Sequence, residues 1–236
     1  MHLRALSLGT ASPSAAADLY AALGARIGGT PRGGDTLVLV GTMITYRRTP
    51  AAPRTVLGFI VPELAVVGDR LTAAGLDWTC ESQGVLGFSD SDGNPCYAVE
   101  SGQRDGVTLI AATLFVRPVG SPAGSAAWWS AAGLPTGRAE TLGYRVPVSA
   151  RHAGDAAVFL DRDLTLHLAA AGDGPVTVMD LRIHVDDPAA LDSAAAGLTA
   201  LGSPVERSET ELRTATPEGI AVALMLRTRL SLSPCA

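Results

Sequence analysis

One predicted strand carries three polar residues that could exchange a proton or hold an ionic group. Asp180, Arg182 and His184 alternate with apolar residues in the segment Val176–Val185. Successive strand residues point to opposite faces, so the polar side chains share one face and the apolar ones the other. A carboxylate, a guanidinium and an imidazole together can bind an anion and transfer a proton near neutral pH. The pattern also fits an edge strand whose polar face meets water, or an ion pair that neutralises itself, and all of these interpretations stay open.

His167 is the third residue predicted for proton transfer, beside Asp180 and His184. It lies in the apolar run Thr165–Leu168, where a single histidine is often only a core residue. Six residues are predicted to contact a ligand, because aromatic walls with a few fixed polar groups suit a small organic molecule. They are Arg4, Tyr46, Arg48, Tyr97, Trp128 and Arg182.

No cofactor motif accompanies these residues. The chain lacks the glycine-rich phosphate loop, the two-histidine zinc helix and the G-x-S-x-G nucleophile turn. Its cysteines, Cys80, Cys96 and Cys235, have no zinc-binding spacing and are predicted to be free thiols. We therefore predict no cofactor.

The composition indicates a protein with a large core and no attraction for polyanions. Of 236 residues 47% are hydrophobic, which excludes intrinsic disorder. The 18 basic and 23 acidic residues give a net charge of −5, so no basic field draws in nucleic acid or a membrane surface. The sequence shows neither a membrane-spanning run nor a secretion signal. We expect a cytoplasmic protein whose partner is a small organic molecule, with a homodimer as a further possibility.

A pattern of elements that occurs four times must position these residues. In each copy an apolar strand leads to an alanine-rich helix, and short strands separated by Gly, Asp or Asn turns follow. Ser12-Pro13 and Asp187-Pro188 are predicted helix starts, since a capping side chain precedes a proline at the first helical position. The helices are predicted to end at Gly24, Gly75, Gly133 and Gly202. The chain therefore consists of four predicted βαβββ units.

These units resemble the vicinal oxygen chelate superfamily, which includes glyoxalases, bleomycin-resistance proteins and extradiol dioxygenases. The resemblance is carried by Val61–Leu64 with Leu71–Leu76, by Phe88 with Asp90–Pro95, and by Val185–Pro188 with Leu198–Gly202. It implies an α+β fold in which two units pair and their curved mixed sheets enclose a cavity. We expect two such domains, at 1–103 and 107–230, with a boundary at Ser101–Gly106 and a tail at 231–236.

The resemblance also implies where each unit would place a metal ligand, in its first and last strands. These places hold Ala5 and Thr45 in the first unit, and Val56 and Tyr97 in the second. In the last two units they hold Ala112–Leu114, His167, Asp180 and Ala223. A divalent site needs three or four protein donors, so we predict no bound metal.

We predict a metal-independent protein that binds an organic metabolite in a cavity, or rearranges it by lyase, isomerase or cyclase chemistry. The alanine-rich, lysine-poor composition resembles that of family members encoded beside natural-product pathways, which associates the chain with secondary metabolism or resistance. The alternative is a divalent-metal enzyme similar to a glyoxalase or dioxygenase, with His167 and Asp180 among its ligands. A third hypothesis is a degenerate domain used for protein association.

Overall fold

The computed structural model describes residues 2–28, 36–48, 55–81, 84–101, 106–116, 122–138, 155–160, 164–170 and 178–227. Within these ranges the chain forms the four expected βαβββ units. The first comprises β1 (His2–Thr10), α1 (Pro13–Leu23), β2 (Arg26–Gly28), β3 (Thr36–Val40) and β4 (Thr42–Arg48). The second comprises β5 (Leu57–Val61), α2 (Leu64–Ala73), β6 (Trp78–Glu81), β7 (Val85–Ser89) and β8 (Pro95–Glu100). The third comprises β9 (Thr108–Val116), α3 (Pro122–Ala131), β10 (Thr136–Arg138), β11 (Ala156–Phe159) and β12 (Thr165–Ala170). The fourth comprises β13 (Val178–Val185), α4 (Pro188–Ala200), β14 (Val205–Arg207), β15 (Glu211–Ala215) and β16 (Ala221–Leu226).

The helix boundaries follow from local chemistry. The Ser12 hydroxyl accepts a hydrogen bond from the Ala15 N–H, and the Asp187 carboxylate accepts one from the Ala189 N–H. Each of these caps satisfies an amide that has no partner inside its helix. Gly24 follows α1 with φ 88°, in the left-handed region where a glycine carries no steric penalty. The predicted starts and ends of these helices are confirmed.

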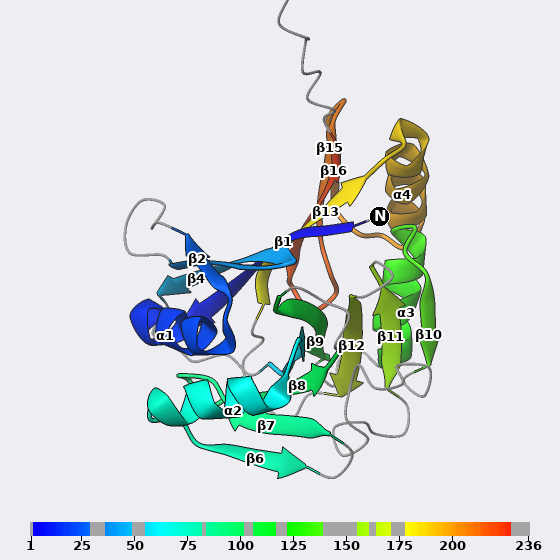
Figure 1. Cartoon of the computed structure of the whole chain (residues 1–236). Coiled ribbons are helices and arrows are strands. Elements are labelled where there is room, and N and C mark those ends of the chain that lie inside the picture. Colours follow the sequence, from blue (N-terminus) through cyan, green and yellow to red (C-terminus); the bar gives the residue numbers. More distant parts are fainter. Residues whose placement is uncertain are drawn as a thin grey trace, which may run out of the picture.

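The strands form two mixed sheets, and each sheet joins two units (Figure 1). In the first sheet the order is β14-β15-β16-β13-β1-β4-β3-β2, so the first and fourth units pair. In the second sheet the order is β10-β11-β12-β9-β5-β8-β7-β6, so the second and third units pair. We expected neighbouring units to pair, and this pairing is a correction. The limits 1–103 and 107–230 remain a prediction, and the tail lies outside the described residues.

The helices lie between the two sheets, where one apolar core joins all four units. In Figure 1, α1 covers one face of the first sheet, α2 covers one face of the second, and these two helices pack on each other. The Tyr20 ring of α1 lies 5.7 Å from the Phe59 ring of β5, centroid to centroid. The opposite pair packs so closely that a Cβ on Gly197 of α4 would lie 2.6 Å from the carbonyl oxygen of Ala131. Each sheet therefore has a helix-covered face and an opposite face.

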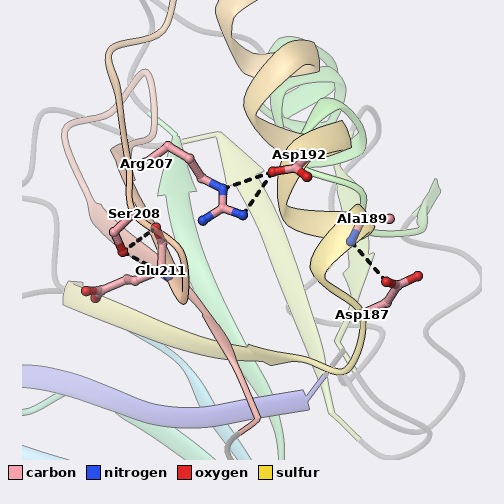
Figure 2. A network of polar contacts seen from close by, with 6 residues as sticks. All are labelled: Asp187, Ala189, Asp192, Arg207, Ser208 and Glu211. Atoms are coloured by element: carbon pink, nitrogen blue, oxygen red, sulfur yellow. Dashed lines mark hydrogen bonds and ion pairs between the residues drawn. The ribbon is translucent and has the colours of Figure 1, made fainter.

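Polar contacts also tie α4 to the strands that follow it (Figure 2). Arg207 of β14 donates from Nη2 to Asp192 of α4 at 2.9 Å. In the turn before β15, the Ser208 hydroxyl donates to the carbonyl of Glu211 at 3.2 Å. The Asp192 side chain is 71% exposed, so this pair contributes little to stability. Among the described helices, none is long and apolar enough to cross a membrane.

Candidate functional site

The alternation predicted for β13 is present in the structure. Leu181 and Ile183 are fully buried on the helix-covered face, whereas Arg182 is exposed and Asp180 and His184 are half-buried. The polar side chains therefore lie on the opposite face of the first sheet. Because β13 is an inner strand with β1 and β16 as neighbours, its polar residues occupy the middle of that face.

Asp180 lies between two arginines. Nη1 of Arg47, from β4, is 3.5 Å from Oδ2 of Asp180, and Nε of Arg182 is 3.9 Å from Oδ1. The Asp180 Oδ1 atom is buried but accepts no hydrogen bond in the structure. The side chains of Asp180, Arg47 and Arg182 are 21%, 40% and 51% exposed, so all three can be reached from solvent. Two guanidinium groups therefore lie near this one carboxylate.

Small residues form the floor around this cluster. Ser7 of β1 and Ala221 of β16 are the Cα partners of Asp180 on its two sides, and Thr45 lies beyond Ser7. Ser7 is only 4% exposed, Thr45 is half-buried and Ala221 is exposed. The face therefore combines short side chains with partly exposed charged groups, and such groups can bind the polar end of a small molecule.

The same face of the second sheet is filled by its own side chains. Tyr97 of β8 is 3% exposed and its ring lies directly over Gly58 of β5. A Cβ on Gly58 would come within 2.2 Å of the Tyr97 ring, so only glycine fits beneath it. Tyr97 also packs with Ala111 and Ala157. It thus stands on the predicted face, but in the second sheet and away from Asp180.

His167 lies on that second sheet too and forms a buried pair that the sequence did not predict. Its Nε2 is 2.8 Å from Oδ2 of Asp155, and both side chains are only 1% exposed. The Cα partner of His167 on β11 is Ala157, which places the imidazole on the same side as Tyr97. His167 and Asp180 therefore belong to different sheets and cannot act on one ligand. This corrects the expectation that they share a cavity or a metal ion.

Two predicted ligand contacts lie in the core instead. Tyr46 is 2% exposed, and its hydroxyl is 2.5 Å from the hydroxyl of Tyr20 on α1. Burial is the main cause that raises the pKa of both tyrosines well above 10. Trp128 of α3 is 2% exposed and donates from its indole N–H to the Ser203 hydroxyl at 2.9 Å. Neither residue reaches the face that carries Asp180, so this arrangement gives their predicted roles no support.

The remaining predicted residues lie near the first sheet's edges or ends. Arg4 is exposed at an irregularity of β1 between Leu3 and Ala5. Arg48 is exposed at the end of β4, one residue beyond Arg47. His184 shares the face of Asp180, four residues further along β13. Of the predicted set, the structure therefore brings together Asp180 and Arg182, with His184 along the same strand.

The residues at the implied metal positions do not fit a divalent cation. In the first sheet these four positions lie close together. Ala5 and Ala223 are in one row across the strands, and Thr45 and Asp180 are in the next row on the same face. Asp180 is the one carboxylate or imidazole among the four, and a divalent site needs at least three such donors. In the part of the chain that the structure describes, no group of three His, Cys, Asp or Glu residues could hold a metal ion.

Comparison with solved structures shows which fold this is. A candidate dioxygenase of Bacillus subtilis superposes with a TM-score of 0.63 at 16% identity, over 96% of this chain and 85% of that one. The V278E variant of maize glyoxalase I superposes with a TM-score of 0.67 at 12% identity, over 95% of this chain and 92% of that one. The chain has the vicinal oxygen chelate fold. The predicted α+β class with four βαβββ units and two sheet domains is thereby confirmed.

No protein-family model and no curated protein sequence matches the chain. At such identities the vicinal oxygen chelate fold says nothing about chemistry, which must be argued from the site. Sequence reasoning missed Arg47 and Asp155. Arg47 could have been found by alternation along the strand, because residue 47 is an odd number of positions from the apolar Ile44 and so points to the face opposite the helix. Asp155 precedes its strand without any such signal.

Proposed function

We propose that this chain binds a small organic molecule on the face of the first sheet opposite its helices, and that Asp180 exchanges a proton with it. The observation that carries the proposal is the buried Oδ1 of Asp180, which accepts no hydrogen bond although two guanidinium groups flank the carboxylate. A buried acceptor without a donor is unusual in proteins. The Asp180 side chain as a whole is 21% exposed, so a ligand hydroxyl or a C–H made acidic by a neighbouring carbonyl would approach the carboxylate from its exposed side.

The two arginines supply the complementary interaction. Arg47 and Arg182 reach Asp180 only at 3.5 and 3.9 Å, so neither forms a short bidentate pair with it. Arg182, whose side chain is 51% exposed, can donate to a carboxylate or to an oxyanion that forms when a proton leaves the ligand. His184 lies on the same face, where an imidazole can return the proton. A cofactor-independent isomerase or lyase reaction uses groups of these kinds as base, acid and oxyanion donor.

A binding protein without turnover would use the same face, and one experiment distinguishes the two. The purified chain is mixed with short 2-hydroxy and 2-oxo acids in D2O, and proton NMR follows both line broadening and loss of the signal next to the carbonyl. We expect binding and exchange by the native chain, with exchange lost and binding retained in Asp180→Asn. Binding without exchange in either protein would indicate a binding protein. Absence of binding by every acid would contradict the proposal.

A matched control separates site chemistry from general charge effects. Asp192 also pairs with an arginine, but on the surface of α4. Asp192→Asn removes the same charge away from the site and is expected to bind and exchange like the native chain. The reaction is also expected to continue with a chelator present, because the proposal routes no step through a metal.

The wider role follows the sequence-based hypotheses. We propose that the ligand is an organic metabolite, with a setting in natural-product metabolism or resistance and a location in the cytoplasm. A homodimer stays a prediction, and sedimentation of the purified chain measures it directly.

A further inference from the structure

Two polar side chains of α3 are buried in the core without a hydrogen-bond partner. Trp129 is fully buried and Ser125 is 2% exposed. In the part of the chain that the structure describes, neither Nε1 of Trp129 nor Oγ of Ser125 makes a hydrogen bond. Buried polar groups in native proteins are almost always paired, because an unpaired one costs free energy. These two atoms therefore need a partner that the described residues do not supply.

The two atoms lie on one face of α3. Ser125 and Trp129 are four residues apart, and residues at this spacing are neighbours on the surface of a helix. Long side chains in a helix point back toward its N-terminus and cover the residue three or four positions earlier. The Trp129 indole therefore extends over Ser125, which brings its N–H and the serine hydroxyl to the same place.

The neighbouring tryptophan provides a comparison within the same helix. The Trp128 ring lies 4.9 Å from the Trp129 ring, centroid to centroid, and its indole N–H donates to the Ser203 hydroxyl at 2.9 Å. Trp128 is 2% exposed, so the two indoles are buried to nearly the same degree. They differ in that a serine hydroxyl accepts the N–H of Trp128 directly, whereas Trp129 and Ser125 form no such bond.

We propose that one buried water molecule bridges Trp129 and Ser125. An indole N–H can only donate, so the bound molecule must accept a hydrogen bond, which excludes a cation. An anion is unfavourable, because α3 carries no charged residue and Trp129 belongs to the apolar core. Water accepts the indole N–H and forms a second hydrogen bond with the hydroxyl, in either direction. Internal waters in proteins typically join polar groups in this way.

Magnetic relaxation dispersion of the water oxygen nucleus counts the long-lived water molecules of a dissolved protein. It is applied to the full chain and to the variants Ser125→Ala, Trp129→Phe and Trp128→Phe. The first two are each expected to lose one long-lived water, because a buried water needs at least two polar partners. Trp128→Phe is the matched control and is expected to lose none, since the indole that it removes is paired with Ser203.

The double variant Ser125→Ala with Trp129→Phe tests whether the two residues share the same water. A shared water predicts the loss of one molecule relative to the native chain. The loss of two from the double variant, the loss of none from either single variant, or a native chain without any long-lived water would each overturn the inference. If Trp129→Phe does not fold, a crystal structure of the native chain decides. Density for a water within hydrogen-bond distance of both atoms is expected there, and a direct bond between Nε1 and Oγ would contradict the proposal.

Discussion

The buried pair of His167 and Asp155 allows a quantitative test of the second sheet. The two atoms are 2.8 Å apart and both side chains are 1% exposed, so the pair has almost no access to water. Replacing His167 by Ala removes this contact from an Asp155 carboxyl group that stays buried. Breaking such a pair by removing one member costs about 3–5 kcal/mol. The cost belongs to the folded state, because both groups are hydrated in the unfolded chain.

Urea denaturation followed by tryptophan fluorescence measures this cost. Trp128 and Trp129 are buried in α3, which packs against β11 and β12, so the signal reports on the elements that hold the pair. With a slope of roughly 2.5 kcal/mol per molar urea, a loss of about 3 kcal/mol lowers the midpoint by about 1.2 M. Asp192→Ala breaks an exposed pair and is expected to lower it by less than about 0.4 M, since such pairs contribute at most about 1 kcal/mol.

A double-mutant cycle shows whether the loss comes from this interaction. Asp155→Ala and His167→Ala are each made alone and then together. Because the second replacement also removes the group that lost its contact, the double variant is expected to be more stable than the sum of the single losses implies, by at least about 1 kcal/mol. Strictly additive losses, or a His167→Ala cost no larger than that of Asp192→Ala, would refute the reasoning and leave His167 available as a site residue.

Three further outcomes follow from other buried contacts. Tyr46→Phe is expected to cost about 1–3 kcal/mol in urea denaturation, because it leaves the Tyr20 hydroxyl buried without its partner, whereas replacing both tyrosines by Phe recovers most of that loss. Burial raises the pKa of both tyrosines, so the unfolded chain loses these protons first, at about pH 10. Their contribution to stability is therefore complete below that pH and is lost as the pH rises through the folded-state values. Urea midpoints measured from pH 9 to 11 should fall more steeply for the native chain than for the double Phe variant. Gly58→Ala is expected to destabilise by about 1–3 kcal/mol or more through its clash with the Tyr97 ring, and this cost should largely vanish in a Tyr97→Ala background.

The individual units could be predicted from the sequence because local chemistry specifies them. Asp187 followed by Pro188 starts α4 where expected, and Gly202 takes a left-handed φ of 72° after it. The predicted turn at Asp90–Asn94 is present as well, with the Asp90 carboxylate accepting the Asn94 N–H at 2.7 Å. Each of these features depends on residues close together in the chain.

The pairing of units could not be predicted in the same way. All four units begin with an apolar strand of similar character, so hydrophobic pattern alone allows any two to lie side by side. The observed pairing puts neighbouring units into different sheets, and contacts between distant residues, such as Tyr20 against Phe59 and Gly197 against Ala131, then join those sheets. These depend on side-chain shape, which periodicity does not reveal. Because we expected the third and fourth units to pair, we also expected His167 and Asp180 to share a site, whereas they lie in different sheets.

The two sheets share one architecture but differ in what their open faces could accept. On the second sheet, the Tyr97 ring occupies the space above Gly58, and His167 uses its imidazole on Asp155; all these side chains are almost completely buried. On the first sheet, the side chains of Asp180, Arg47 and Arg182 are partly exposed. A ligand on the second sheet would have to displace packed side chains, whereas one on the first would meet charged groups that solvent already reaches. This difference in exposure, rather than the fold, is the reason for proposing the site on the first sheet.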